Sequence, residues 1–233
     1  MQARSSHFLT VLALAAALAM CAGQYAIWLY APEEVTMGVV QKIFYVHLPL
    51  AWWAFAAFFG VFVTSVLALW KGTDTWDCWA GVLAELGVLF SGLALITGSL
   101  WGRAAWNTWW TWDPRLSTTL IMWFVYAGYL VLRAADVGGA KGARVRAVLG
   151  IVAFLDVPLV FLSARLWRSI HPAVFASKGG GLAPEMWTTV WINIIAWGIL
   201  GTALAVARYR NERLHSQVQG VLATMHDHFA ERG

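Results

Sequence analysis

Residues 82–101, VLAELGVLFSGLALITGSLW, decide the fold class of this chain. The stretch is mostly apolar and carries one charged side chain, Glu85. About 20 apolar helical residues cross a hydrocarbon layer about 30 Å thick, so the stretch predicts a membrane-spanning helix. Five further runs of this kind lie at 8–30, 49–70, 117–133, 147–165 and 187–207.

The composition points to the same class. The chain has 233 residues, of which 60% are hydrophobic and 12% charged, whereas roughly 25% of residues are charged in soluble domains. No long polar insertion separates the runs. We therefore predict an all-α membrane protein with six transmembrane helices in a single domain, residues 1–233.

The first run could also be a signal peptide, because Arg4 precedes the apolar stretch FLTVLALAAALAMCAG. However, Met20 is a poor residue before a lipoprotein cysteine, and apolar character continues through Tyr30. We expect an uncleaved spanning helix.

Cys21 and Cys78 are the only cysteines and form no C-x-x-C pair. This excludes a dithiol exchange site and covalent C-x-x-C-H haem attachment. The histidine pair in HDH, residues 226–228, lies in a polar tail and is interpreted as solvated. Glu85 and Asp156 are functional candidates because carboxyl groups in membrane spans are rare, but we favour polar contacts within the bundle.

The distribution of Lys and Arg predicts the orientation, because cytoplasmic flanks of membrane spans are enriched in these residues. With both termini inside, ten cations fall on the inner side: Arg4, Lys71, Arg133, Lys141, Arg144, Arg146, Arg208, Arg210, Arg213 and Arg232. Six fall outside: Lys42, Arg103, Arg115, Arg165, Arg168 and Lys178. This excess predicts cytoplasmic termini and places the long connections 31–48, 101–116 and 166–186 outside, where function is expected.

The connection 101–116, called the Trp loop below, opens with WGRAAWNTWWTWDPR. It holds five tryptophans: Trp101, Trp106, Trp109, Trp110 and Trp112. One or two tryptophans at a bilayer surface are ordinary anchors. A short interfacial helix here would align Trp106, Trp109 and Trp110 on one stripe. Such a shelf suits a large, planar, apolar ligand such as a porphyrin, and we favour this interpretation over a simple aromatic belt.

Three other residues of the Trp loop are expected to shape its backbone. Gly102 permits close approach of another backbone segment, and Pro114 stops the helix before the fourth span begins. Asp113 is expected to cap a turn or hold Arg115 rather than to take part in chemistry.

Among the six histidines, only His47 and His171 fall on the predicted outer side; His7, His215, His226 and His228 belong to the inner termini. Both occur beside a proline at the edge of a span, in YVHLP and SIHP. Two imidazoles from separate connections can occupy both axial positions of a haem iron. The alternative is a hydrogen-bonded structural role for each.

The outer cations are candidates to neutralise the two haem propionates, and arginine is preferred for a bidentate grip. The alternative is snorkelling of their side chains to the interface. The candidates are Arg103, Arg115, Arg165, Arg168 and Lys178.

Residues 101–117, WGRAAWNTWWTWDPRLS, resemble the WWD signature W-G-x-x-x-W-x-x-W-W-x-W-D-x-R-L-T of haem-handling proteins in cytochrome c maturation. In length, number of spans and one histidine on each side of this loop, the whole chain is similar to the CcmC family. Ser117 replaces the usual threonine, and Pro114 fills a variable position as in the larger relatives CcmF and CcsA, which have many more spans.

The resemblance implies that His47 and His171 are axial ligands of haem b. It also implies a haem platform formed by Trp101, Trp106, Trp109, Trp110, Trp112 and Asp113. The implied partners are the periplasmic haem chaperone CcmE, the small subunit CcmD and the ABC transporter CcmAB. The implied location is the bacterial inner membrane, with the haem site facing the periplasm.

Our hypothesis is a haem-presenting membrane protein rather than an enzyme, with covalent haem attachment on the partner chaperone. One alternative is a b-type cytochrome that transfers electrons within a membrane oxidoreductase, which would normally hold haem between spans. A second is a transporter for haem or another anionic aromatic, but the spans hold few central polar residues and the chain has no G-x-x-x-x-G-K-[ST] motif.

Overall fold

The computed structural model describes residues 2–135, 139–167 and 182–230. Within these ranges the chain is helical apart from short connections. The helices are α1 (Gln2–Tyr25), α2 (Phe44–Lys71), α3 (Asp74–Trp106), α4 (Pro114–Ala134), α5 (Gly139–Ala153), α6 (Asp156–Leu166) and α7 (Pro184–Ala230). A π-helical turn, η1 (Ala26–Tyr30), extends α1, and a 3₁₀ turn, η2 (Val39–Ile43), leads into α2.

Six helical segments in the described residues are long and apolar enough to cross a membrane, which confirms the predicted fold class. The segments are His7–Tyr30, Val39–Lys71, Asp74–Trp106, Pro114–Ala134, Lys141–Ser163 and Pro184–His226. Most extend beyond the apolar runs, because a helix continues past the hydrocarbon layer wherever its polar residues reach the interface.

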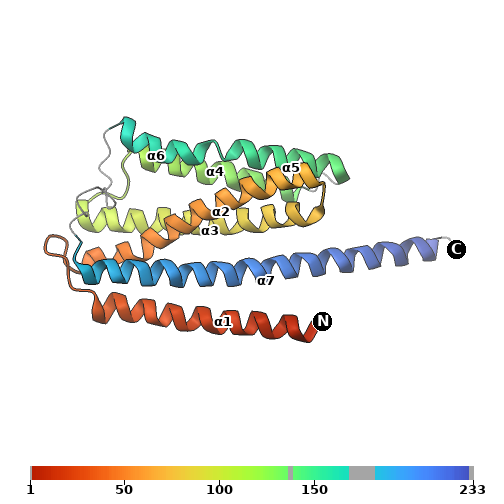
Figure 1. Ribbon diagram of the computed structural model, residues 1–233. Helices are drawn as coiled ribbons and strands as arrows, with labels where there is room; N and C mark the ends of the chain where they lie inside the picture. The colour runs from red at the N-terminus through yellow and green to blue at the C-terminus, as the bar shows by residue number, and fades with distance from the viewer. Residues whose placement is uncertain (1, 136–138, 168–181, 231–233) are drawn as a thin grey trace.

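The long connections gather at one end of the bundle (Figure 1). Residues 31–38 and 107–113 lie at this end, where α6 also ends and α7 begins. We call it the loop end. Both chain termini point the other way, and we call that the terminal end (Figure 1). Two of the three connections predicted to share one side, 31–48 and 101–116, therefore lie at the same end, whereas most of the third, 166–186, lies outside the described residues.

Helices α2 and α3 form the centre of the bundle. Phe58 on α2 is fully buried and stacks on Tyr126 of α4, with ring centroids 3.7 Å apart. Gly87 on α3 makes room for this ring, because a Cβ atom at that position would lie 2.3 Å from Phe58 Cε1. Large apolar rings therefore hold α2, α3 and α4 together at mid-depth.

Ion pairs fasten the helices near the terminal end. Asp77 on α3 receives hydrogen bonds from Arg133 on α4 and Arg146 on α5, each with a contact of 2.9 Å. Glu85 accepts from Arg208 on α7 at 2.6 Å. This confirms our preferred interpretation of Glu85 as a polar contact within the bundle.

The fifth span is interrupted, whereas the sequence predicted one continuous run. Phe154, Leu155 and Val157 make i→i−3 backbone hydrogen bonds between α5 and α6. Pro158 explains the break, since a proline lacks an N–H donor and its ring clashes with the carbonyl four residues earlier. Asp156 begins α6, and its buried Oδ2 has no hydrogen-bond partner among the described residues.

Candidate functional site at the loop end

The Trp loop is not a separate helix, so this part of the prediction was wrong. Helix α3 continues through Trp106 and ends at Asn107, whose φ of 57° lies in the left-handed region. Residues 107–113 have no helical structure. Arg103 donates to both the backbone carbonyl and the side-chain oxygen of Asn107, which holds the chain in this reversal.

Two expected backbone roles are confirmed in the Trp loop. A Cβ on Gly102 would lie 3.1 Å from the carbonyl oxygen of Thr108, so glycine allows the returning chain to approach closely. Asp113 Oδ1 accepts from the backbone N–H of Arg115 at 2.9 Å and caps α4, with Pro114 in the first turn. This cap fixes the direction in which the chain leaves the loop.

The five tryptophans do not form one flat shelf. Trp101 is buried and lies 5.7 Å from Trp106 with the rings tilted by 44°. Trp110 meets Trp112 edge to face at 6.1 Å. Trp109 and Trp112 are exposed, at 58% and 79% of their surface. The structure therefore presents a buried indole at the helix end and exposed indole edges beyond it.

The candidate cations have different surroundings. Arg103 lies 5.9 Å from the centre of the Trp109 ring and braces the loop through Asn107. The guanidinium of Arg115 is half-buried at the start of α4. Arg168 and Lys178 lie outside the described residues, as does the side chain of Arg165.

His47 lies within the first turns of α2, not in the preceding connection as predicted. Helix α2 begins at Phe44 despite Pro49, because Phe44 and Tyr45 are buried against the rest of the loop end. The predicted second ligand, His171, lies outside the described residues.

The protonation of the His47 ring follows from its partner on α3. His47 Nδ1 lies 3.1 Å from Thr97 Oγ1. The Thr97 hydroxyl donates its own proton to the carbonyl of Leu93 at 2.8 Å, so its oxygen accepts from His47. This arrangement favours the tautomer with the proton on Nδ1, in which Nε2 carries the lone pair of the ring.

Gly98 and Trp101 complete the surroundings of this imidazole. A Cβ on Gly98 would lie 3.0 Å from His47 Cε1, so glycine lets the ring lie directly against α3. The centroid of Trp101 is 6.0 Å from that of His47. Thr97, Gly98 and Trp101 thus form one face of α3. We did not predict Thr97 or Gly98, although both lie one helical turn before Trp101.

Several buried polar atoms at the loop end have no protein partner among the described residues: Gln41 Oε1, Tyr45 Oη, Trp101 Nε1, Trp110 Nε1 and Thr111 Oγ1. Buried polar groups in folded proteins are nearly always hydrogen-bonded, to protein, water or ligand. These atoms surround the Trp loop and the start of α2.

The fold and the site define a class: a multi-pass helical membrane protein whose elaborated end carries an aromatic loop beside a histidine that contacts α3. Residues 1–223 match the family described as CcmC, Heme exporter protein C. The chain therefore belongs to the CcmC family.

Individual relatives agree with the family match. The Heme exporter protein C of Bradyrhizobium diazoefficiens is 34% identical over 227 residues, covering 94% of this chain and 84% of that protein. The protein of the same name in Haemophilus influenzae is 31% identical over 187 residues, or 79% and 76% of the two chains. A putative cytochrome c biosynthesis ccmC-like mitochondrial protein of Marchantia polymorpha is 30% identical over 155 residues, or 66% and 65%.

Proposed function

We propose that this protein binds haem at the loop end and presents it to a periplasmic chaperone for cytochrome c maturation. The names of the relatives support haem handling in cytochrome c biosynthesis. Family membership also favours a transport or presentation protein over a catalyst. In this proposal the protein carries haem b and must release it to the chaperone.

The observation that carries the proposal is the setting of His47. His47 Nδ1 lies 3.1 Å from Thr97 Oγ1, and Gly98 lets the ring lie directly against α3, so we propose Nε2 as the nitrogen that binds the haem iron. His171 would supply the second axial bond. Its placement stays a prediction, supported by the fact that α6 ends and α7 begins at the loop end (Figure 1).

The aromatic residues have divided roles in this proposal. Buried Trp101 supports the histidine, while the exposed edges of Trp109 and Trp112 contact the macrocycle or the chaperone. Arg103, Arg115 and Arg168 are the proposed partners of the propionates. Because this end of the bundle is open, one edge of the haem remains accessible for transfer.

The proposed partners are CcmE as acceptor, with CcmD and the ABC transporter CcmAB in the same assembly. The proposed location is the bacterial inner membrane, with cytoplasmic termini and a periplasmic loop end. The ten-to-six distribution of Lys and Arg supports this orientation.

Substitution of the two histidines tests the axial assignment. His47→Ala and His171→Ala should each shift or abolish the Soret absorption of the purified protein. His215→Ala, a substitution of an exposed histidine on α7, is the matched control and should leave the spectrum unchanged. Unchanged haem absorption in both loop-end variants would refute the assignment.

Substitution of Trp109 tests the presentation step. Trp109→Ala should weaken haem loading of the chaperone without reducing insertion into the membrane. Trp191→Ala removes a similarly exposed indole from α7 and serves as control. An equal insertion defect in Trp109→Ala would favour a simple anchoring role.

An electron-transfer role is the second candidate, because His47 lies inside a helix as in b-type cytochromes. It differs from haem presentation in its dependence on a redox partner. Reduction of the bound haem by quinol at a turnover rate would favour electron transfer, whereas haem transfer to the chaperone without quinol favours presentation.

A further inference from the structure

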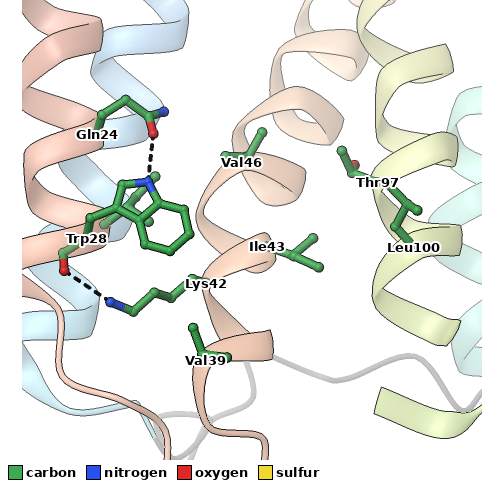
Figure 2. A pocket seen from close by; sticks show the side chains of 9 residues that line it. Gln24, Trp28, Val39, Lys42, Ile43, Val46, Thr97 and Leu100 are labelled. Atoms are coloured by element: carbon green, nitrogen blue, oxygen red, sulfur yellow. Dashed lines mark hydrogen bonds between the residues drawn. The ribbon is translucent and has the colours of Figure 1, made fainter. Parts of the chain in front are cut away.

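A cleft opens between α1 and α3 near the loop end, with the start of α2 as its floor (Figure 2). It has a volume of about 250 Å³. We call it the Lys42 cleft, and its principal lining residues are Gln24, Trp28, Lys42, Ile43, Val46 and Leu100. Helix α1 packs mainly on α7, which leaves its side toward α3 uncovered.

Lys42 places in this cleft a positive charge that has no ion-pair partner among the described residues. The residue keeps only 9% of its surface exposed. Its ammonium donates to the carbonyl of Trp28 at 3.3 Å and lies 5.4 Å from the centre of the Trp28 ring. None of the ion pairs in the described part of the chain involves Lys42. A buried cation without a counter-ion is costly, so the site favours an anion.

The acidic residues of the adjacent connection do not supply that anion. The carboxylate of Glu34 accepts from the backbone N–H groups of Thr36 and Met37 and thus closes its own turn. Glu33 is exposed and forms no ion pair with Lys42. Two of the three ammonium donors of Lys42 therefore remain for a ligand.

Gln24 adds a second donor group. The indole N–H of Trp28 donates to Gln24 Oε1 at 3.1 Å (Figure 2). Since an indole N–H only donates, this contact fixes the amide orientation and leaves the Gln24 NH₂ group for another acceptor. The cleft thus combines an ammonium and an amide donor with apolar walls.

We propose that the Lys42 cleft binds one anionic phospholipid from the leaflet at the loop end. The phosphate contacts Lys42, and the upper part of an acyl chain lies along Ile43, Val46 and Leu100. The cleft is smaller than the roughly 300–1,000 Å³ of pockets that enclose drug-sized ligands, so it does not enclose a porphyrin. Trp28 lies at the end of a span, the level at which headgroups meet protein.

Native mass spectrometry of the full chain, purified in detergent and titrated with phosphatidylglycerol or phosphatidylcholine, tests the proposal. The wild-type protein should retain one phosphatidylglycerol under conditions that remove phosphatidylcholine. Lys42→Gln should weaken this retention by about tenfold or more, the effect of losing a hydrogen bond to a charged group. Lys42→Arg should keep it.

Lys71→Gln is the matched control. Lys71 also lies 5.4 Å from an indole centre, that of Trp76, but it is exposed and at the terminal end. A second variant, Leu100→Trp, fills the cleft while keeping the Lys42 charge and should also expel the lipid. Loss of lipid in both variants would therefore not be explained by a folding defect of Lys42→Gln alone.

Three outcomes would overturn the proposal. The first is unchanged phosphatidylglycerol retention in Lys42→Gln and Leu100→Trp. The second is equal retention of phosphatidylcholine by the wild-type protein. The third is loss of haem absorption in Lys42→Gln with lipid retention unchanged, which would assign the ammonium to a haem carboxylate.

Discussion

Gly98→Ala should weaken haem binding at the proposed site without destabilising the fold. The added Cβ would lie 3.0 Å from His47 Cε1, whereas ordinary contact begins at 3.4 Å, so the ring must move by about 0.4 Å. A functional ligand must be held within about 0.5 Å of its productive position, so this displacement uses most of that tolerance. We expect haem affinity to fall by about tenfold, the lower end of the effects caused by changing the support of a metal ligand.

The same substitution should not destabilise the helix. Alanine favours a helix interior over glycine by roughly 0.5–1 kcal/mol, so the thermal unfolding temperature should stay constant or rise. Gly128→Ala on α4 is the control, because its Cβ meets no atom within 4 Å. Haem titration followed by Soret absorption gives the affinity. Wild-type affinity in Gly98→Ala, or an equal loss in both variants, would refute the reasoning.

Three further substitutions test other contacts. Thr97→Val removes the hydroxyl that contacts His47 Nδ1 and should weaken haem binding by about 10- to 100-fold. Thr97→Ser keeps the hydroxyl and should retain the wild-type affinity. Haem titration, with resonance Raman spectra of the iron–histidine bond, compares the two variants. Asp77→Asn leaves Arg133 and Arg146 without their shared carboxylate and should lower the free energy of unfolding by about 3 kcal/mol. Glu212→Gln is the comparison, because the Arg208–Glu212 pair is more exposed. It should lower the free energy of unfolding by about 0.5 kcal/mol or less, and thermal unfolding measures both variants. Asp113→Ala removes the cap of α4 and should cost about 1 kcal/mol, with faster proteolysis of the Trp loop, whereas Asp113→Asn should retain the cap.

The six spans could be predicted because the bilayer imposes a length and an apolar composition on each crossing. The residues at which the helices begin and end could not be predicted in this way. The apolar run placed the start of the second span at Pro49, but burial of Phe44 and Tyr45 extends the helix back to Phe44. Tertiary packing therefore decided whether His47 lies in a loop or a helix.

The conformation of the Trp loop shows a second limit. The spacing of Trp106, Trp109 and Trp110 matched a helical stripe, yet the helix ends at Asn107. Asparagine tolerates the left-handed region better than most residues, and this was a local signal against a continuous helix. The hydrogen bonds from Arg103 that fix this reversal were not visible in the spacing.

The residues that contact His47 could not be predicted from the sequence, for a different reason. Thr97 lies on another helix, 50 residues away in sequence, and its hydroxyl makes the side-chain contact that sets the histidine proton. No local pattern connects two such positions. The Trp loop indicated which end of the molecule carries the proposed site, but the contacts that hold the His47 ring required the packing of α2 on α3.

The ion pairs among the described residues lie toward the terminal end of the bundle, away from the proposed haem site. At the terminal end, Asp77 and Glu85 join α3 to α4, α5 and α7 through arginines. At the loop end, buried indole and hydroxyl groups such as those of Trp101, Trp110 and Thr111 lack protein partners among the described residues. The ion pairs join the helices, and we propose that the polar atoms of the loop end receive hydrogen bonds from the bound molecule. A site built in this way can exchange its occupant with a partner while the helices beneath it stay in place.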